Sequence, residues 1–492
     1  MHNVYSDAHD LVECHSGEEA LEHIKRIYNE NCDQIKELFN EEVSKNPEKY
    51  AGLIAKGLNY PYVGIKVDHK DMVMDPPLPY GVALDPGVYG TTVTRPDIFG
   101  YYYREQIDLL IKNHKVPVVV GLSDWPIPFP FVPCLSSINL NKEHLLRLGT
   151  DFVFPNLTRV NDDIANNRPR KDHAKPLPLA FFTAERVDYS ISRLYHYTAT
   201  APNHFQDFIL LTNYQRYIDE FIEFAKNEME NGTEYSEFVQ PGDHITYNKN
   251  MGGKQPEGEI ADKLPQMPAY HLKRPDHQGI TFINIGVGPS NAKTITDHLA
   301  VLRPHCWIML GHCAGLRRTQ LLGDYVLAHA YVREDKILDD DLSLQVPIPA
   351  IAEVQVALQE AVGNITGLKG AEAKIRLRTG TVLTTLDRQW ELRSQDLSQL
   401  FKQTRAIAVD MESATIAANG FRFRVPYGTL LCVSDKPIHG EIKLRGTANA
   451  FYSERVSQHL MVGIETIKLI RDRGVRYLHS RKLRGFDEPP FR

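Results

Sequence analysis

Two carboxylate sites near the C-terminus carry the clearest chemical signal in the sequence. Asp410 and Glu412 lie in the stretch Asp410-Met411-Glu412-Ser413, and Asp435 follows Ser434 after a helical stretch and a strand-like run. Cleavage of a glycosidic bond passes through a cationic sugar and needs two carboxyl groups in different states. We expect a protonated Asp435 to act as general acid on the leaving group and an ionised Glu412 to accept hydrogen bonds from sugar hydroxyls.

The same residues also fit a purely structural interpretation. Asp410 is a favourable N-cap for a helix over 411–418, and Glu412 is favourable in its first turn. Asp435 would then be an ordinary residue at the end of the strand that is predicted over 428–433. These residues alone leave both interpretations open, so the choice between them depends on the rest of the C-terminal half.

Composition narrows the function classes. The chain has 492 residues, enough for two or three domains, and its net charge of −6 does not indicate a nucleic-acid partner. Six cysteines are scattered without a Cys-x-x-Cys pair, as in a reduced cytoplasmic protein. No apolar signal segment and no run of 18 apolar residues is present, so we expect no membrane span. In His305-Cys306 and His312-Cys313 neighbouring side chains would point to opposite faces of a strand, so we expect no metal.

The N-terminal part, residues 1–175, is predicted to be an α+β domain with one long helix and a small sheet. A capping box at Ser16–Glu19 begins an amphipathic pattern that continues to about residue 43. A second helix is predicted over 97–112, and the polar stretch 166–178 is predicted to be a linker. Short β-branched segments predict strands at 62–67, 88–94 and 116–120.

Residues 176–492 are predicted to form an α/β domain with a mixed, mainly parallel sheet. Strand and helix patterns alternate from residue 279 onward, which is typical of such a sheet. The stretch 231–268 is rich in glycine, proline and charge, and we expect a flexible insertion or a flap there. Predicted strands are 208–211, 280–285, 307–310, 324–331, 373–383, 405–409 and 428–433. Predicted helices are 214–228, 290–302, 350–361, 411–418 and 456–471.

Two glycine-bearing turns are predicted to face a ligand. Gly286, Gly288 and Ser290 lie between a strand and a helix, where free N–H groups favour an anion. The third glycine of a dinucleotide fingerprint is missing, so a nicotinamide cofactor is not indicated, and a simple tight turn capped by Ser290 stays possible. A second turn is expected at Gly311–Gly315. Ligands lie beyond the carboxyl ends of strands in open α/β sheets, so both turns and both carboxylates are expected on one rim.

These motifs, in this order, resemble the nucleoside phosphorylase and nucleosidase superfamily. The resemblance is carried by residues 286–290, 311–315, 409–413 and 433–435 and spans roughly residues 200–470. A closer similarity to the bacterial AMP nucleosidase family rests on residues 409–415 and 434–441, together with Thr94-Arg95-Pro96-Asp97 and the stretch 184–189 in the N-terminal half.

The resemblance implies hydrolysis of AMP to adenine and ribose 5-phosphate, with Asp435 as the purine-protonating acid and Glu412 as the ribose acceptor. It also implies that Met411 packs on the sugar and that Leu383 lines the purine pocket. No cofactor is required by the chemistry. The family further implies a homohexamer with a regulatory N-terminal domain, activated by ATP with Mg²⁺ and inhibited by phosphate.

One departure from the phosphorylases favours water as the nucleophile. Many phosphorylases hold the attacking phosphate with an arginine and a serine at the places that are Met309 and His312 here. A thioether cannot neutralise a phosphate dianion. A purine nucleoside phosphorylase and a non-catalytic nucleotide sensor remain the alternatives. For the 5′-phosphate of AMP, Arg317 and Arg318 are the candidates, unless they are only a basic pair on the surface.

Overall fold

The computed structural model describes residues 4–40, 58–133, 152–168, 175–441, 448–478 and 480–492. The chain forms two compact units, one of Met1–Arg193 with Arg484–Arg492 and one of Leu194–Leu483. The sequence placed the boundary at 175/176, whereas the structure places it inside helix α5 (Ala184–Thr198). The C-terminal tail belongs to the first unit, where the Gly81 N–H donates to the Pro490 carbonyl at 2.6 Å.

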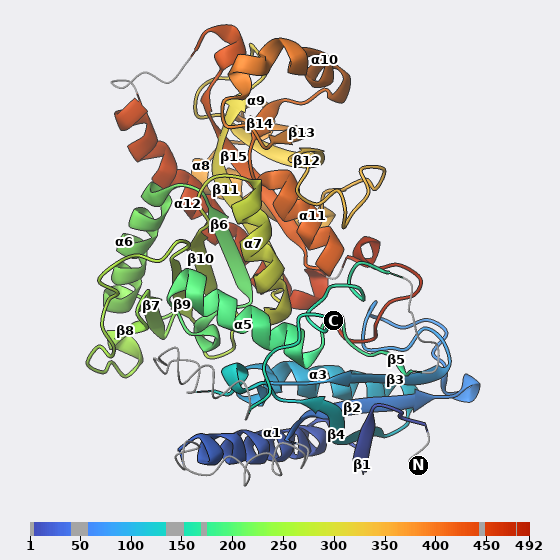
Figure 1. The fold of residues 1–492 in the computed structure, drawn as a ribbon. Helices are drawn as coiled ribbons and strands as arrows, with labels where there is room; N and C mark the ends of the chain where they lie inside the picture. The colour runs from blue at the N-terminus through green and yellow to red at the C-terminus, as the bar shows by residue number, and fades with distance from the viewer. Residues whose placement is uncertain (1–3, 41–57, 134–151, 169–174, 442–447, 479) are drawn as a thin grey trace. The chain divides into compact units, whose positions relative to one another are not determined.

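The first unit is an α+β fold, as predicted. Helix α1 (Gly17–Asn40) packs against helix α3 (Pro96–His114) and against the sheet (Figure 1). Half of the predicted capping box is present: the Glu19 N–H donates to Ser16 Oγ at 3.2 Å, whereas the Glu19 carboxylate accepts from the His15 N–H at 2.7 Å. Residues 41–43, where the helix was expected to end, lie outside the described residues. The sheet has the order β1 (Ala8–Cys14), β4 (Val118–Pro126), β2 (Asn59–Val67), β3 (Gly87–Thr92), β5 (Leu177–Pro178).

A ten-stranded mixed sheet forms the second unit, which confirms the predicted fold class. Its central strands β10, β6, β11 and β15 run parallel to one another, so their carboxyl ends share one edge. Strand β14 pairs with both β13 and β11, which closes the strands β11, β15, β12, β13 and β14 into a ring. The order is β14 (Ala408–Asp410), β13 (Leu377–Thr385), β12 (Tyr325–Glu334), β15 (Tyr427–Asp435), β11 (Cys306–Gly315), β6 (Phe208–Thr212), β10 (Ile280–Asn284), β9 (Ala269–Lys273), β7 (Glu237–Gln240), β8 (His244–Tyr247).

The helices of this unit bury the central strands, as the apolar runs of a parallel sheet require. Helix α11 packs on α7 and on the strands of the ring, whereas α12 packs on α6 and α8 (Figure 1). The described helices are α6 (Gln215–Asn231), α7 (Pro289–Leu299), α8 (Ala352–Thr366), α9 (Gly370–Arg376), α10 (Ser394–Thr404), α11 (Ser413–Phe423) and α12 (Ala448–Arg473).

Within residues 231–268, predicted to be a flexible insertion or a flap, β7 and β8 extend the sheet beyond β9 around a turn at Gly242, whose φ is 94°. Two local predictions are wrong, each for a reason visible in the structure. The expected turn at Gly311–Gly315 is part of β11, because pairing with β15 and β14 continues to its last residue. The expected strand 373–383 begins only at Leu377, since α9 occupies the preceding residues.

Candidate active site

The two predicted carboxylates line one cavity of about 180 Å³ in the second unit. Its walls come from the segments that follow β6, β10, β13 and β14 and from the carboxyl-terminal halves of β11 and β15. The lining residues are Asn213, Tyr214, Val287, His312, Cys313, Ala314, Arg388, Trp390, Glu391, Val409, Asp410, Met411, Glu412, Ser434 and Asp435. The parallel strands and the ring closure through β14 therefore bring together residues that are far apart in the sequence.

Asp410 anchors the start of α11 and so fixes the segment that carries Glu412. Its Oδ2 accepts from the Ser413 N–H at 2.9 Å, and its Oδ1 accepts from Thr384 Oγ1 at 2.6 Å. Asp410 therefore holds the start of α11, but it is not the N-cap as predicted, because the helix begins at Ser413 rather than at 411 and Glu412 occupies the N-cap position. Glu412 lies at the break between β14 and α11, where its side chain lines the cavity.

Glu412 is a buried carboxyl group held by two donors. It is 1% exposed, its Oε1 accepts from the Gly288 N–H at 2.6 Å, and its Oε2 accepts from Asn213 Nδ2 at 2.8 Å. Burial, followed by the neighbouring Asp410, raises the pKa of Glu412 to about 8, and the two donors oppose this shift. The site without a ligand therefore disfavours the ionised form of Glu412, and a ligand that donates hydrogen bonds to it favours that form.

Gly288 supplies the backbone conformation that makes this contact possible. Its φ of 113° is strained for other residues, and the space around its absent side chain is open. Gly288 also precedes Pro289, the first residue of α7. The structure thus places Gly288 at the site through its N–H, while Ser290 is exposed in the first turn of α7 and does not line the cavity.

Asp435 is the last residue of β15 and is partly buried. Ser434 Oγ donates to Asp435 Oδ1 at 2.5 Å, which orients the carboxyl group. The next residue, Lys436, is buried but directs its ammonium group away, to the Gln320 carbonyl at 2.8 Å and to Glu441 at 2.7 Å. The cation next in sequence is therefore engaged elsewhere.

Only some of the other predicted site residues line this cavity. Met411 lines the cavity with Glu412. Leu383, predicted to line the purine pocket, is fully buried in a core cluster with Ala314 and Trp390 and is not among the residues that line this cavity. Gly311 lies within β11, and a Cβ on it would lie 3.4 Å from Asn213 Oδ1.

The predicted cationic pair lies outside this cavity. Arg317 and Arg318 are both exposed, and Arg317 donates to the Arg405 carbonyl at 2.9 Å. Within the described part of the chain, Arg388 is the one lysine or arginine that lines the cavity. Sequence reasoning missed Arg388 because its loop has no motif, whereas Asn213 was detectable as the polar residue that follows the buried strand β6.

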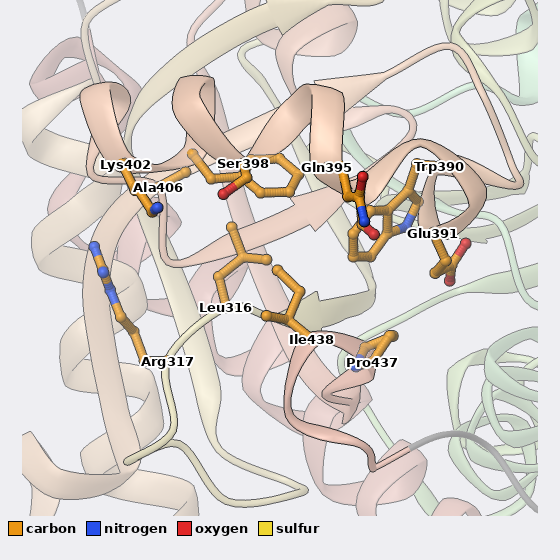
Figure 2. A pocket seen from close by; sticks show the side chains of 12 residues that line it. Leu316, Arg317, Trp390, Glu391, Gln395, Ser398, Lys402, Ala406, Pro437 and Ile438 are labelled. Atoms are coloured by element: carbon orange, nitrogen blue, oxygen red, sulfur yellow. The ribbon is translucent and has the colours of Figure 1, made fainter.

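A second, larger cavity of about 490 Å³ adjoins the first and shares Trp390 and Glu391 with it. Figure 2 shows Trp390 and Glu391 at one end, Arg317 and Lys402 at the other, and apolar side chains between them. The two cavities together reach the size typical of small-ligand sites, about 300–1,000 Å³.

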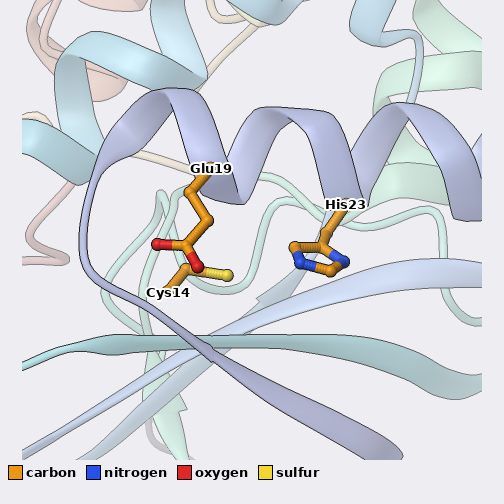
Figure 3. Close-up of side chains that lie close together, drawn as sticks. All are labelled: Cys14, Glu19 and His23. Atoms are coloured by element: carbon orange, nitrogen blue, oxygen red, sulfur yellow. The ribbon is translucent and has the colours of Figure 1, made fainter.

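Metal-type side chains come together elsewhere in the described chain, at Cys14, Glu19 and His23 (Figure 3). Two of them have other partners: Glu19 Oε2 accepts from the His15 N–H at 2.7 Å, and Arg26 Nη2 lies 2.9 Å from His23 Nδ1. Burial, followed by Glu19, raises the pKa of Cys14 to about 11, which disfavours the thiolate that binds metals.

Comparison with known proteins identifies the family. The chain is 45% identical over 477 residues to AMP nucleosidase of Escherichia coli K12, covering 96% of this chain and 98% of that protein. It belongs to the AMP nucleosidase family. Residues 19–176 match the family described as the bacterial AMP nucleoside phosphorylase N-terminus, and residues 269–460 match the phosphorylase superfamily.

A solved structure is also similar to part of the chain. The crystal structure of AMP nucleosidase from Bacteroides thetaiotaomicron is 29% identical and covers 58% of this chain and 98% of that one, with a TM-score of 0.42. The family membership confirms the resemblance drawn from the motifs at Glu412 and Asp435. None of the described helices has both the length and the apolar character needed to cross a bilayer.

Proposed function

We propose that the protein hydrolyses the N-glycosidic bond of AMP to give adenine and ribose 5-phosphate. The observation that carries the proposal is that Glu412 and Asp435 line the same cavity in a member of the AMP nucleosidase family. Binding alone would not require a carboxyl group placed to donate a proton, so a catalytic role is favoured over that of a nucleotide sensor.

In this proposal the two carboxyl groups divide the work. Asp435 donates a proton to N7 of adenine as the bond between C1′ and N9 breaks, and the bond electrons pass to the base. Glu412 accepts hydrogen bonds from the ribose hydroxyls and opposes the positive charge that develops at C1′. The N–H groups of Gly288 and Asn213 hold each carboxylate oxygen of Glu412 in place for this task.

The cavity also suggests how the rest of AMP is held. Trp390, shared by the two cavities, offers a flat wall for the base, and Met411 packs on the sugar. For the 5′-phosphate, the geometry favours Arg388 over Arg317 and Arg318, because Arg388 lines the cavity that contains both carboxylates. Guanidinium binds phosphate through paired N–H groups.

Water is the proposed nucleophile. Met309, which stands where phosphorylases have a phosphate-binding arginine, is fully buried in β11. Within the described chain the cavity offers Arg388 as its one strong cation, which the 5′-phosphate would occupy. A second phosphate dianion would therefore lack a counter-charge, so the site fits hydrolysis better than phosphorolysis.

Regulation and assembly follow from the family resemblance and are proposals of the same kind. We propose activation by ATP with Mg²⁺, inhibition by phosphate, a homohexameric assembly, a role in purine salvage and a cytoplasmic location. The first unit holds a cavity of about 1010 Å³, lined by both basic and acidic side chains, which offers space for an effector. The described cysteines are free thiols, which suits a reducing compartment.

The test is adenine release from AMP in buffer without phosphate, followed by chromatography of both products. Hydrolysis gives adenine and ribose 5-phosphate at a rate that does not depend on phosphate as a substrate. A strict requirement for phosphate, with ribose 1,5-bisphosphate as product, would show a phosphorylase. AMP binding without any adenine would show a sensor.

A further inference from the structure

A chain of three side chains leads from the active-site cavity into the core of the second unit. His312 lines the cavity, and its Nε2 lies 3.3 Å from the hydroxyl oxygen of Tyr217. That oxygen lies 2.7 Å from Nδ1 of His459. Tyr217 and His459 are completely buried, and the three residues come from β11, α6 and α12.

Aromatic packing fixes the orientation of these rings. Tyr214 lies edge-on to His312 with ring centroids 4.7 Å apart, and Tyr217 packs on His312 at 5.6 Å. Tyr325 packs on His459 at 5.2 Å. With the ring positions fixed, the chemical state of His312 depends on which of its nitrogens carries the proton.

The inner end of the chain determines that state. Burial lowers the pKa of His459 to about 3, so His459 is neutral. The Tyr217 hydroxyl is a stronger donor than a neutral imidazole N–H, and its contact to His459 is the shorter of its two contacts, so the hydroxyl donates to Nδ1 of His459. The Tyr217 oxygen in turn accepts from Nε2–H of His312. In this arrangement Nδ1 of His312 carries the lone pair.

We propose that His312 is the base that takes a proton from the attacking water, and that Tyr217 and His459 are positioning residues that hold its tautomer. This inference deepens the proposed hydrolysis of AMP and depends on it. It explains why an imidazole stands at the place where phosphorylases have a phosphate-binding serine. A water molecule needs a proton acceptor that works near neutral pH, whereas a phosphate anion needs only donors.

The proton balance of the step is complete. The water oxygen forms a bond to C1′ while the bond between C1′ and N9 breaks, and its electrons pass to adenine. One water proton goes to Nδ1 of His312, and the proton of Asp435 goes to N7 of the base. His312 then releases its proton to solvent and Asp435 takes one up, so the net reaction is AMP and water to adenine and ribose 5-phosphate.

The test is nucleophile rescue of His312→Ala. We expect kcat for AMP to fall by about 10²–10⁴-fold, the usual contribution of a general base, with KM changed less than about threefold. Azide carries no proton to remove, so added azide should restore adenine release and give the 1-azido sugar phosphate. Asp435→Asn, which lacks the acid instead, should not respond to azide. Wild-type kcat in His312→Ala, or a loss of activity that azide does not reverse, would overturn the proposal.

A second pair of variants tests the positioning role without removing a ring. Tyr217→Phe removes the hydroxyl between the two histidines, and we expect kcat to fall about tenfold at an unchanged KM. Tyr325→Phe is the matched control, because it also packs on His459 but its hydroxyl bonds to Gln458 at 2.9 Å. Equal kcat values for the two variants would remove Tyr217 from the role.

The wild-type enzyme separates this inference from the proposed function. If it releases no adenine from AMP without phosphate, the proposed hydrolysis fails. If it does release adenine while His312→Ala keeps the wild-type kcat, hydrolysis stands and only the role of His312 fails.

Discussion

Asp188 in the first unit and Glu412 in the second are both buried carboxyl groups with a raised pKa, and the two groups differ in what they face. In the first unit, Asp188 is 4% exposed, and burial raises its pKa to about 7. It accepts hydrogen bonds from the Tyr60 hydroxyl at 2.7 Å and from Thr94 Oγ1 at 2.9 Å. In the second unit, Glu412 is buried to the same degree but also lines a cavity.

The comparison shows that a raised pKa alone does not mark a functional residue. The hydroxyls of Tyr60 and Thr94 satisfy Asp188 from within its own unit, and Asp188 lines none of the three cavities described above. The same contact joins the stretches 94–97 and 184–189 within the first unit. Glu412 instead combines burial with access to a ligand, which is the combination expected of a catalytic group.

The strongest contrast is expected between the two carboxyl-to-amide substitutions. Glu412→Gln removes the charge that stabilises the cationic sugar, so we expect kcat for AMP to fall by about 10³-fold. Asp188→Asn should leave kcat per folded molecule within about twofold of the wild type and should lower stability by about 1–3 kcal/mol. Steady-state kinetics on active-site-titrated protein and thermal melts check both. A comparable loss of kcat in Asp188→Asn would break the distinction.

Substrate selectivity sharpens the assignment of the cavity. Arg388→Ala should lower the ratio of kcat/KM on AMP to kcat/KM on adenosine by about 10–100-fold, because adenosine lacks the 5′-phosphate that Arg388 is proposed to bind. Arg318→Ala removes an exposed arginine outside both cavities of the second unit and should leave the ratio unchanged. The reverse pattern would return the phosphate site to the pair predicted from the sequence.

The pH dependence of kcat/KM reports the state of Glu412 in the free enzyme. Ionised Glu412 is the form that accepts from ribose, so kcat/KM should rise as pH increases through about 8. Asp410→Asn removes the neighbouring negative charge and should shift this limb to lower pH by about one unit. Glu391→Gln changes a lining carboxyl group farther along the cavity and should leave the limb in place. A limb that does not move in Asp410→Asn would assign it to another group.

The pH dependence of stability should show a smaller effect than the kinetic changes, with the same sign for Asp188 and for Glu412. Each carboxyl group has a folded-state pKa above the value of about 4 in the unfolded chain, so its contribution is present at low pH and lost as pH rises. The slope is at most about 1.4 kcal/mol per pH unit and group. The decrease in melting temperature from pH 5 to pH 8 should therefore be smaller for Glu412→Gln and for Asp188→Asn than for the wild type. A fall as steep as that of the wild type would contradict the raised pKa values.

The sequence allowed the fold class and the two carboxylates to be predicted because their signals are local. Buried strands of the α/β unit appear as apolar runs, and Glu412 and Asp435 follow two of these runs directly. Because the carboxyl ends of parallel strands share one edge of the sheet, the two carboxylates were expected to lie together, and they line the same cavity.

Pairing between distant strands was not predictable in the same way. The Gly311–Gly315 segment reads as a turn, and only its pairing with β14 and β15 makes it a strand. Arg388 has no sequence signal, since its position depends on how the loop after β13 folds back to the cavity. The bonds from Asn213 and Gly288 to Glu412 likewise depend on tertiary contacts.

The role of Asp435 can be tested most directly by making the leaving group independent of a proton. AMP needs protonation of its base, whereas the p-nitrophenyl riboside 5-phosphate releases a stable anion. We expect Asp435→Asn to lose about 10²–10⁴-fold in kcat on AMP while it keeps nearly wild-type kcat on the nitrophenyl substrate. Equal losses on the two substrates, or wild-type turnover of AMP, would contradict the assignment of Asp435 as the acid and with it the account of this site.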